Sequence, residues 1–241
     1  MSTFRSKHSQ KDKTAKMSEP STDYHDYVFK NGRLVGQFEE MYRHSATVPW
    51  HQNTQADWID VRLTKQFLTD VGPFDEIHDL GCGLGNYLDL IRHSAGTKNC
   101  RCQGYDISET ACEKARIQFP HFTFTQFDLT TAEKIRAAPD QKGNRLFMLR
   151  GTLWYVVPKL EVVISNIRAL MQPGDKFLVV QNFPPLGSSF IGKDILRDHH
   201  ALIKHMSRFF ISIRHIWYED TLKTANDNWF IGLFSTKDST K

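Results

Sequence analysis

The feature that most constrains the fold of this chain is a run of three glycines at alternate positions, Gly81, Gly83 and Gly85. An apolar stretch that ends at Asp79 precedes them, and an amphipathic stretch follows from Tyr87. This order is typical of a strand, a tight turn and a helix, because glycine permits positive φ angles and lets a ligand approach the backbone closely. The first turn of the helix also offers unpaired N–H groups. The segment therefore predicts a site for a nucleotide-like ligand at the end of a strand.

The spacing of these glycines differs from that of dinucleotide-binding turns. Those turns read G-x-G-x-x-G and place a pyrophosphate at the helix N-terminus. Here the third glycine comes one residue early, and Asp79 stands before the first. An acid at this point does not suit a pyrophosphate, whereas it suits a ligand that carries an amine or hydroxyls. The spacing therefore disfavours a NAD-type oxidoreductase.

Strand and helix patterns alternate through the middle of the chain. The expected strands cover 77–80, 102–107, 122–127, 145–149 and 176–181, and the expected helices include 56–71, 108–119, 130–138 and 158–170. Such alternation predicts an α/β fold, with a doubly wound, mostly parallel sheet and helices on both faces. Further along, a helix is expected over 194–206, and two strands over 209–218 and 229–234.

Polar residues and one glycine stand at the ends of the predicted strands: Asp79, Asp106, Asp128, Arg150 with Gly151, and Asn182. In an open parallel sheet, ligands bind at the carboxyl ends of the strands. Asp106 also lies about 20 residues beyond the glycines, where nucleotide-binding folds place an acid for the ribose hydroxyls. This convergence predicts the binding site more strongly than any single motif does.

The charge of the chain is concentrated at its N-terminus. The formal net charge is +4, and the first 16 residues hold five basic side chains against one acid, so the rest is formally neutral. A neutral body argues against a nucleic-acid enzyme, which needs a basic face to neutralise phosphates. Residues 1–22 lack the apolar side chains that would offset chain entropy, and we expect a disordered basic tail there.

Composition also limits where in the cell we expect this protein to be. No apolar run approaches the roughly 20 residues of a transmembrane helix, and the N-terminus lacks the apolar core of a secretory signal. The four cysteines form no C-x-x-C pair, so reduced thiols fit better than disulfides or zinc. We expect a cytoplasmic protein, monomeric or homodimeric, with no metal and no membrane or nucleic-acid partner.

Aromatic residues mark a separate segment over 23–55. Its aromatic side chains are Tyr24, Tyr27, Phe29, Phe38, Tyr42 and Trp50. This segment is expected either to pack on the domain as a strap or to cover the ligand as a lid, and the two roles are compatible. The remaining residues, 56–236, are expected to form the ligand-binding domain, with no second domain and no repeat.

Several stretches together resemble one family. Asp79-x-Gly81-x-Gly83-x-Gly85 resembles the first motif of class I S-adenosylmethionine (SAM)-dependent methyltransferases. Residues 151–156 look like the V-L-Y-Y-L stretch of nodulation-type and related small-molecule N- and O-methyltransferases, and Met41-Tyr42 with Pro49-Trp50 resembles their M-Y…P-W element. Residues 170–175 match an L-x-P-G-G turn, except that Asp175 replaces the second glycine.

The resemblance covers about 38–234 and carries expectations for fold and activity. It implies a Rossmann-like sheet of seven strands that ends in an antiparallel hairpin. It also implies transfer of a methyl group from SAM to a nitrogen or oxygen of a small-molecule acceptor, with S-adenosylhomocysteine (SAH) as product. A protein or peptide methyltransferase and a non-catalytic SAM-fold binding protein are the alternatives.

The resemblance also assigns cofactor-binding residues. The glycine turn would lie beneath the methionine part of SAM, Asp79 would orient its amino group, Asp106 would accept the ribose hydroxyls, and Asp128 would face the adenine. Each acid has a structural alternative, since Asp106 and Asp128 can also cap helices. The complete expected set is Tyr42, Trp50, Asp79, Gly81, Cys82, Gly83, Gly85, Asp106, Ile107, Phe127, Asp128, Leu129, Leu149, Arg150, Gly151 and Trp154.

A catalytic base is needed only for some acceptors. A neutral amine needs little help, whereas a hydroxyl needs a base near neutral pH, a role that suits histidine. The candidates are His199, His200 and His205, with Tyr155 and His51 behind them, although any one histidine is more often a surface or packing residue than a base.

Two departures from the family limit this interpretation. Gln181 and Asn182 stand where related enzymes often carry an acid. The run 182–185 resembles the motif of nucleic-acid amino-methyltransferases but follows the wrong strand, so we do not predict base methylation.

Overall fold

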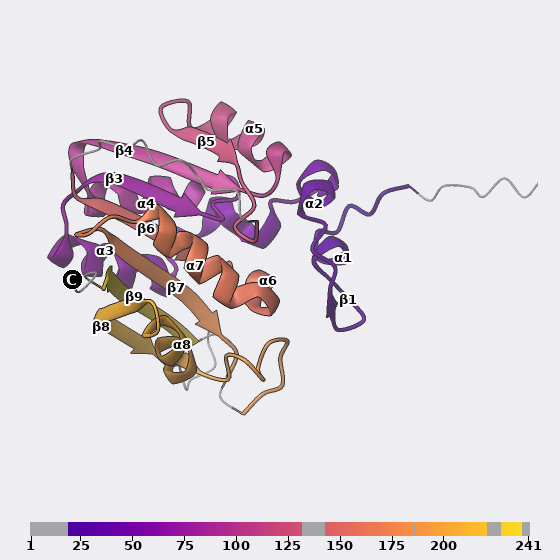
Figure 1. Ribbon diagram of the computed structural model, residues 1–241. Helices are drawn as coiled ribbons and strands as arrows, with labels where there is room; N and C mark the ends of the chain where they lie inside the picture. Colours follow the sequence, from indigo (N-terminus) through magenta and orange to yellow (C-terminus); the bar gives the residue numbers. More distant parts are fainter. Residues whose placement is uncertain (1–18, 132–142, 186, 221–227, 238–241) are drawn as a thin grey trace, which may run out of the picture.

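A computed structural model describes residues 19–131, 143–185, 187–220 and 228–237 of the chain. Its centre is a seven-stranded sheet in the order β5–β4–β3–β6–β7–β9–β8 (Figure 1). The strands are β3 (Phe74–Leu80), β4 (Gly96–Asp106), β5 (Thr123–Gln126), β6 (Arg145–Arg150), β7 (Lys176–Phe183), β8 (Phe210–Tyr218) and β9 (Asn228–Thr236). β3 to β7 pair in parallel, and β9 runs antiparallel between β7 and β8.

Helices cover both faces of this sheet. One face carries α3 (Ile59–Val71), α4 (Asn86–Ala95) and α5 (Glu109–Gln118), and the other carries α6 (Leu153–Val156), α7 (Leu160–Leu170) and α8 (His199–Met206). The inner strands β3, β6 and β7 are buried along most of their length. Burial on both faces explains why their sequences are nearly continuous apolar runs. The predicted doubly wound sheet with a terminal antiparallel hairpin is confirmed.

Some bounds differ from those expected. β4 begins at Gly96, earlier than the predicted strand, and α8 begins at His199 instead of residue 194. The α8 difference has a clear cause, because the Asp198 side chain accepts a hydrogen bond from the Ala201 N–H at 2.8 Å and so caps the helix there. Residues 132–138 of the helix expected over 130–138, and the first 18 residues of the expected tail, lie outside the described residues.

The aspartate that replaces a family glycine has a partner in the core. Arg145, at the start of β6, donates from Nε to Asp175 Oδ1 at 3.1 Å, and both side chains are buried. The Gln172 N–H also donates to Asp175 Oδ2 at 2.6 Å. Asp175 therefore closes the turn before β7 and neutralises a buried guanidinium, which no glycine could do.

The aromatic segment lies beside the carboxyl ends of the strands (Figure 1). It contains α1 (His25–Val28), β1 (Phe29–Lys30), β2 (Arg33–Leu34), α2 (Phe38–His44) and the 3₁₀ helix η1 (Pro49–Thr54). The Glu39 carboxylate ties it to the start of α5, because it accepts from Ser108 Oγ at 2.7 Å and from the Thr110 N–H at 3.2 Å. We call residues 23–55 the strap.

The strap also forms hydrogen bonds with the two residues that precede it. The Tyr27 hydroxyl donates to the Ser21 carbonyl at 2.7 Å, and the Ala46 N–H donates to the Thr22 carbonyl at 3.0 Å.

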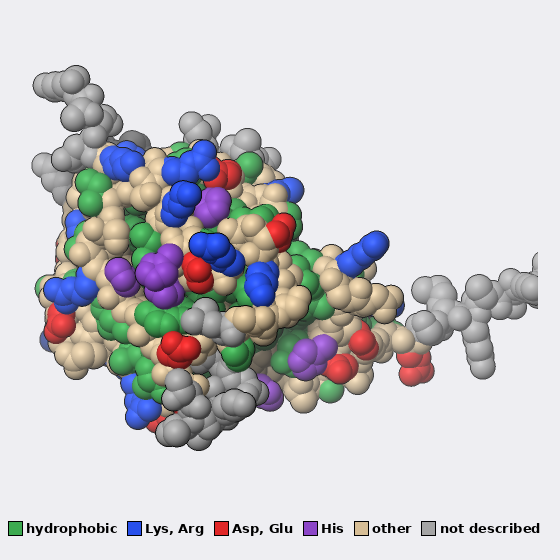
Figure 2. Space-filling view, turned by 90° about the horizontal axis from the view of Figure 1, so that it is seen from below, with side chains coloured by type: hydrophobic (Ala, Val, Ile, Leu, Met, Phe, Trp, Pro, Cys, Tyr) green, Lys and Arg blue, Asp and Glu red, His purple; other side chains and the backbone are tan. Residues whose placement is uncertain are grey.

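The surface on the side of α8 and β8 is mixed in character. Seen from below the view of Figure 1, basic and histidine side chains gather near the middle of the face, with acidic side chains among them (Figure 2). In the described part of the chain, no helix has the length and apolarity to cross a bilayer.

Candidate active site

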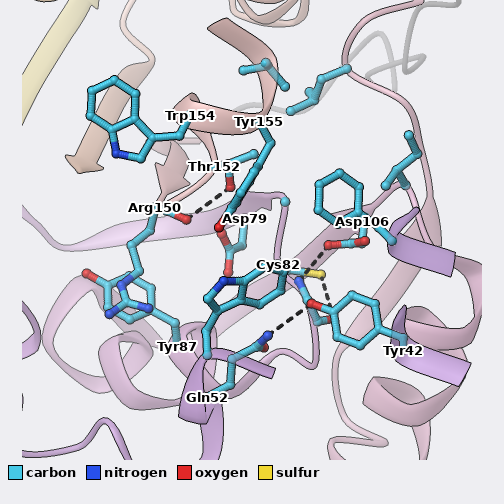
Figure 3. A pocket seen from close by; sticks show the side chains of 18 of the residues that line it. Tyr42, Gln52, Asp79, Cys82, Tyr87, Asp106, Arg150, Thr152, Trp154 and Tyr155 are labelled. Atoms are coloured by element: carbon cyan, nitrogen blue, oxygen red, sulfur yellow. Dashed lines mark hydrogen bonds between the residues drawn. The ribbon is translucent and has the colours of Figure 1, made fainter. Parts of the chain in front are cut away.

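A cavity of about 410 Å³ opens at the carboxyl ends of the strands. The strap, the carboxyl ends of β3, β4, β5 and β6 with the turns that follow them, and α6 line most of it (Figure 3). Trp58, Tyr87, Asn182 and Trp229 complete the lining. This is the edge at which the sequence predicted a ligand. Its size lies within the range of about 300–1,000 Å³ that is usual for small-molecule sites.

The floor of the cavity is the turn after β3. Gly81 and Gly83 have φ angles of 82° and 54°, in the left-handed region that favours glycine. A Cβ atom on Gly81 would lie 2.5 Å from Thr152 Oγ1, and one on Gly83 would lie 2.5 Å from Gln52 Oε1. Both space and backbone conformation therefore require glycine where the strap and α6 come close.

Asp106 joins this turn to the end of β4. Its Oδ2 accepts from the Gly83 N–H at 2.8 Å and its Oδ1 from the Ser108 N–H at 3.0 Å. Burial raises the pKa of Asp106 to about 6, although the hydrogen bonds from Ser108 and Gly83 oppose that shift. A carboxylate accepts about four hydrogen bonds, so the side chain keeps acceptor capacity for a ligand.

Asp79 lies at the end of β3 and is only 2% exposed. Burial raises the pKa of this carboxyl to about 7; the positive charge of Arg150 lowers it, and the negative charge of Asp106 raises it further. The side chain lines the cavity. It can change its charge near neutral pH, and it offers a counter-charge to a cationic group of a ligand.

Arg150 is held firmly at the end of β6. Its Nε and Nη2 atoms donate to Asp60 Oδ2 at 3.0 and 2.8 Å, and Nη1 donates to Gln55 Oε1 at 2.6 Å. The guanidinium carbon also lies 4.5 Å from the centre of the Tyr87 ring. The result is a positively charged group in the cavity wall whose position is fixed by α3, α4 and η1.

The strap closes the cavity through two polar contacts and a strained turn. Gln52 donates from Nε2 to the Tyr42 hydroxyl at 3.0 Å and accepts from the Leu84 N–H at 2.9 Å, which ties η1 to the glycine turn. Trp50 and His51 have φ angles of 52° and 53°, in a region that non-glycine residues rarely adopt. Two such residues in succession, both lining a cavity, are the kind of strain found at functional sites.

The wall opposite the glycine turn comes from α6. Trp154 donates from Nε1 to the Asn182 carbonyl at 2.9 Å. The centre of the Tyr155 ring lies 5.3 Å from that of Phe38 and 5.6 Å from that of Trp50, so α6 contacts the strap in the lining of the cavity. Burial raises the pKa of the Tyr155 hydroxyl above its ordinary value, which keeps it neutral.

The structure brings most of the predicted site residues to this one cavity. Those that line it are Tyr42, Trp50, Asp79, Gly81, Cys82, Gly83, Asp106, Ile107, Phe127, Asp128, Leu129, Arg150, Gly151, Trp154 and Tyr155. Their roles toward a ligand remain predictions.

Five predicted residues do not line the cavity, and one of them, His205, instead lies with its Nδ1 3.2 Å from Glu161 Oε1. Gly85 precedes α4 as its N-cap with a φ of 79°, and a Cβ atom there would meet the Phe124 ring at 2.7 Å. Leu149 is buried in the core beneath α7. The His199 ring stacks on Trp217 with centroids 4.1 Å apart, and His200 packs beside it at 4.0 Å. These two histidines therefore lie at the start of α8, away from the lining.

Several lining residues were not predicted. They include Gln52, Gln55, Thr152 and Tyr87 together with Trp58 and Trp229. Asp60, which holds Arg150, was also missed. The aromatic residues of the strap gave a compositional signal, but no local pattern marks a glutamine or an aspartate that meets a partner far along the chain.

Comparison with known proteins agrees with this geometry. Residues 77–174 match the family model described as a methyltransferase domain. The chain carries a class I SAM-dependent methyltransferase domain. Within it lie the glycine turn, the two acids Asp79 and Asp106, and Arg150.

The chain is also similar to individual proteins, in sequence or in structure. A carboxy-S-adenosyl-L-methionine synthase of Shewanella sp. (strain W3-18-1) is 30% identical over 162 residues, which cover 65% of this chain and 61% of that protein. The chain thus spans about three fifths of the length of that relative. Among solved structures, the N-methyltransferase NodS of Bradyrhizobium japonicum WM9, in complex with SAH, has a TM-score of 0.56 at 12% identity, covering 79% of this chain and 93% of NodS.

Magnesium protoporphyrin IX methyltransferase of Synechocystis PCC 6803 with bound SAM is a further structural neighbour. Its TM-score is 0.53 at 17% identity, and the match covers 89% of this chain and 90% of that one. At such identities the likeness is one of fold alone.

Proposed function

We propose that this protein transfers a methyl group from SAM to a nitrogen or oxygen of a small-molecule acceptor. The observation that carries the proposal is the convergence of the glycine turn, Asp79 and Asp106 on one cavity that the strap closes. A cavity of this size can hold SAM, or its product SAH, together with a small acceptor. We also propose that the protein acts in the cytoplasm, as a monomer or homodimer, without a nucleic-acid or membrane partner.

The residues present fit SAM chemically. Gly81 and Gly83 line the cavity, and without side chains of their own they leave the backbone of the turn open to a ligand on that side. Asp106 has spare acceptor capacity for a pair of hydroxyls, and Asp79 offers a carboxylate for an amine. When bound, SAM supplies an electrophilic methyl group on a sulfonium.

The chain then has two tasks in the reaction. It must align the acceptor with that methyl group, and it must exclude water. The Trp50 and Tyr155 rings meet over the cavity and serve the second task. Their faces also attract a cation. The strap must open for ligands to exchange, since its residues contact both the glycine turn and α6.

An acceptor hydroxyl would require a group that takes its proton. Among the described residues, His51 is the histidine that lines the cavity, and its backbone is held in a strained conformation. We assign it this task ahead of His199 and His200, which stack on Trp217 and on each other. An amine acceptor would not need His51.

The likeness to a carboxy-SAM synthase favours a second candidate, in which the protein modifies SAM itself. The two candidates differ in product, because methyl transfer leaves SAH whereas modification leaves a heavier SAM derivative. Mass spectrometry of the nucleoside products after incubation with metabolite extracts distinguishes them.

Titration calorimetry with SAM, SAH and NAD tests cofactor binding, on which the proposal depends. We expect binding of SAM and SAH and none of NAD; binding of NAD without a response to SAM would overturn the proposal. Incubation with methyl-labelled SAM and a panel of amines and hydroxylated metabolites then identifies the acceptor class. Label that enters protein instead of small molecules would indicate a protein methyltransferase.

A further inference from the structure

Aromatic rings gather around Trp50 in the part of the cavity that the strap closes. The centres of four neighbouring rings lie 5.6–6.5 Å from that of Trp50, and these rings belong to Tyr155, Tyr24, Tyr42 and Phe38. All five residues line the cavity. Phe38, Trp50 and Tyr155 are only partly buried, so part of their ring surface is left for a ligand. We call these five rings the aromatic wall.

The centre of the aromatic wall is held in place by hydrogen bonds. Trp50 has a φ angle of 52°, and its carbonyl accepts from Gln55 Nε2 at 2.7 Å. The carbonyl of the next residue, His51, accepts from Thr54 Oγ1 at 3.1 Å. A backbone conformation that is rare without glycine is therefore fixed before a ligand arrives, and a wall fixed in this way loses little entropy on binding.

Polar side chains beside the aromatic wall are already engaged. The Thr152 hydroxyl donates to the Arg150 carbonyl at 3.1 Å, and the Trp154 indole N–H donates to the Asn182 carbonyl at 2.9 Å. An anion that leaves water needs hydrogen-bond donors in its place. This part of the lining therefore suits an apolar or cationic group better than an anion.

The charge of the lining favours the same class of ligand. Among the described residues that line the cavity, the acidic side chains Asp79, Asp106 and Asp128 outnumber the guanidinium of Arg150. Arg150 also donates from Nε and Nη2 to the buried carboxylate of Asp60. An acidic acceptor would thus meet an excess of carboxylates, whereas an ammonium is attracted both by carboxylates and by the faces of aromatic rings.

We propose that the methyl acceptor is an amine carried on a flat, apolar body that stacks on the aromatic wall. This inference rests on the proposed function and deepens it by choosing nitrogen over oxygen and by excluding acidic acceptors. An amine suits the site because it needs no base beside it, whereas a hydroxyl does. The histidine of the described lining, His51, has an exposed side chain.

The charges of the transfer step agree with this assignment. The ammonium of the acceptor first loses a proton to water, and the lone pair that this frees forms the new N–C bond. The electron pair of the broken C–S bond stays on sulfur, so SAH is the second product. The methylated nitrogen then carries the positive charge that the sulfonium has given up, and the ring faces attract that charge.

Two ligands of similar shape and opposite charge test the acceptor class. Phenethylamine and 3-phenylpropionate both carry a phenyl ring on a two-carbon chain, which ends in an ammonium or in a carboxylate. Calorimetry with the full chain saturated with SAH measures the Kd of each. We expect phenethylamine to bind at least about 10-fold more tightly. Equal affinities, tighter binding of the acid, or no binding of phenethylamine would overturn the inference.

Variants of Tyr155 test whether the ring is responsible for this preference. Tyr155→Leu keeps an apolar surface but has no ring face, so it should reduce the preference for the amine by about 3-fold or more. Tyr155→Phe keeps the ring and should keep the preference. Phe209→Leu is the matched control, because Phe209 is partly buried in the core beside α8 and does not line the cavity. Thermal melting checks that each variant is folded.

The outcomes separate this inference from the proposed function. A preference that is unchanged in folded Tyr155→Leu, or lost in folded Tyr155→Phe, would overturn the role of the aromatic wall while the protein still binds SAH. If the wild-type protein binds neither SAM nor SAH, the proposed function itself fails.

Discussion

Among single residues, Asp79 links ligand binding to pH. Its pKa in the folded protein is about 7, raised by burial above the ordinary value of 3.8. This group therefore stabilises the ligand-free fold below about pH 4, and the contribution is lost as the pH rises through 7. Binding of an ammonium requires the ionised carboxylate.

We therefore expect affinity for SAM to increase between about pH 6 and 8, while the melting temperature of the ligand-free protein decreases. Calorimetry and thermal melting across this range measure both trends. Asp79→Asn should flatten them. A wild-type affinity that does not change with pH would contradict the assignment.

Asp106 has a structural task beside its proposed ligand task. Because it accepts from the Gly83 and Ser108 N–H groups, Asp106→Ala should lower the free energy of unfolding by about 1–3 kcal/mol. It should also weaken SAM by about 10- to 100-fold, through loss of the ribose acceptor and loosening of the turn. Asp89→Ala, on the exposed side of α4, is the control for both measurements. If Asp106→Ala binds SAM with the affinity of the wild type, Asp106 only caps the chain and does not bind the ligand.

The sequence located some of these residues and missed others for a physical reason. Asp79 and Asp106 stand where an apolar run ends, so local patterns revealed them. Asp60 meets Arg150 across 90 positions of sequence. Such a contact depends on how α3 packs against the sheet, and no local pattern records that.

At the scale of elements, Glu39 attaches α2 to the start of α5, and we expect this contact to hold the strap closed. Burial acts to raise the pKa of Glu39, but hydrogen bonds from Thr110 and Ser108 outweigh it and lower the pKa to about 2. A lowered pKa means that this contribution to stability is present above about pH 4.5 and is lost as the pH falls through 2.

Glu39→Ala should therefore loosen the strap. We expect a loss of about 1 kcal/mol in stability, small because the side chain is 36% exposed, and a faster release of SAM. Glu40→Ala is the control, since Glu40 pairs with Arg43 and His44 within α2 itself. Stopped-flow release of a bound ligand measures the rate. Equal rates in both variants would show that the contact does not govern release.

The order of the elements was predictable, whereas their ends and the turn of the strap were not. Alternating strand and helix patterns leave few topologies for a parallel sheet. The left-handed Trp50 and His51 depend on support from Gln55 and Thr54, which hydrogen-bond their carbonyls. Likewise, His199 was a candidate base because of its residue type, but periodicity does not show which neighbour a helix end contacts.

At the scale of the whole molecule, we expect the stability of the folded part to be independent of the basic residues near the N-terminus. Deletion of residues 2–18 should change neither the affinity for SAM nor the melting temperature, because composition gives that stretch little apolar surface to bury. Deletion through residue 22 should lower the melting temperature, since the carbonyls of Ser21 and Thr22 accept hydrogen bonds from the strap. Thermal melting of the two shortened chains compares them. A large loss in the first would show that the tail is docked.

The position of β9 also has a consequence for how the protein is made. β9 is the last strand among the described residues, yet it lies inside the sheet and pairs with both β7 and β8. On the ribosome, β8 therefore emerges before β9, and β7 is an open edge until β9 has been translated. Exposed edges of this kind attract other chains. A stop codon shortly before Asn228 would thus remove β9 and leave β7 and β8 without the strand that pairs with both, and the product should be found in inclusion bodies instead of the lysate.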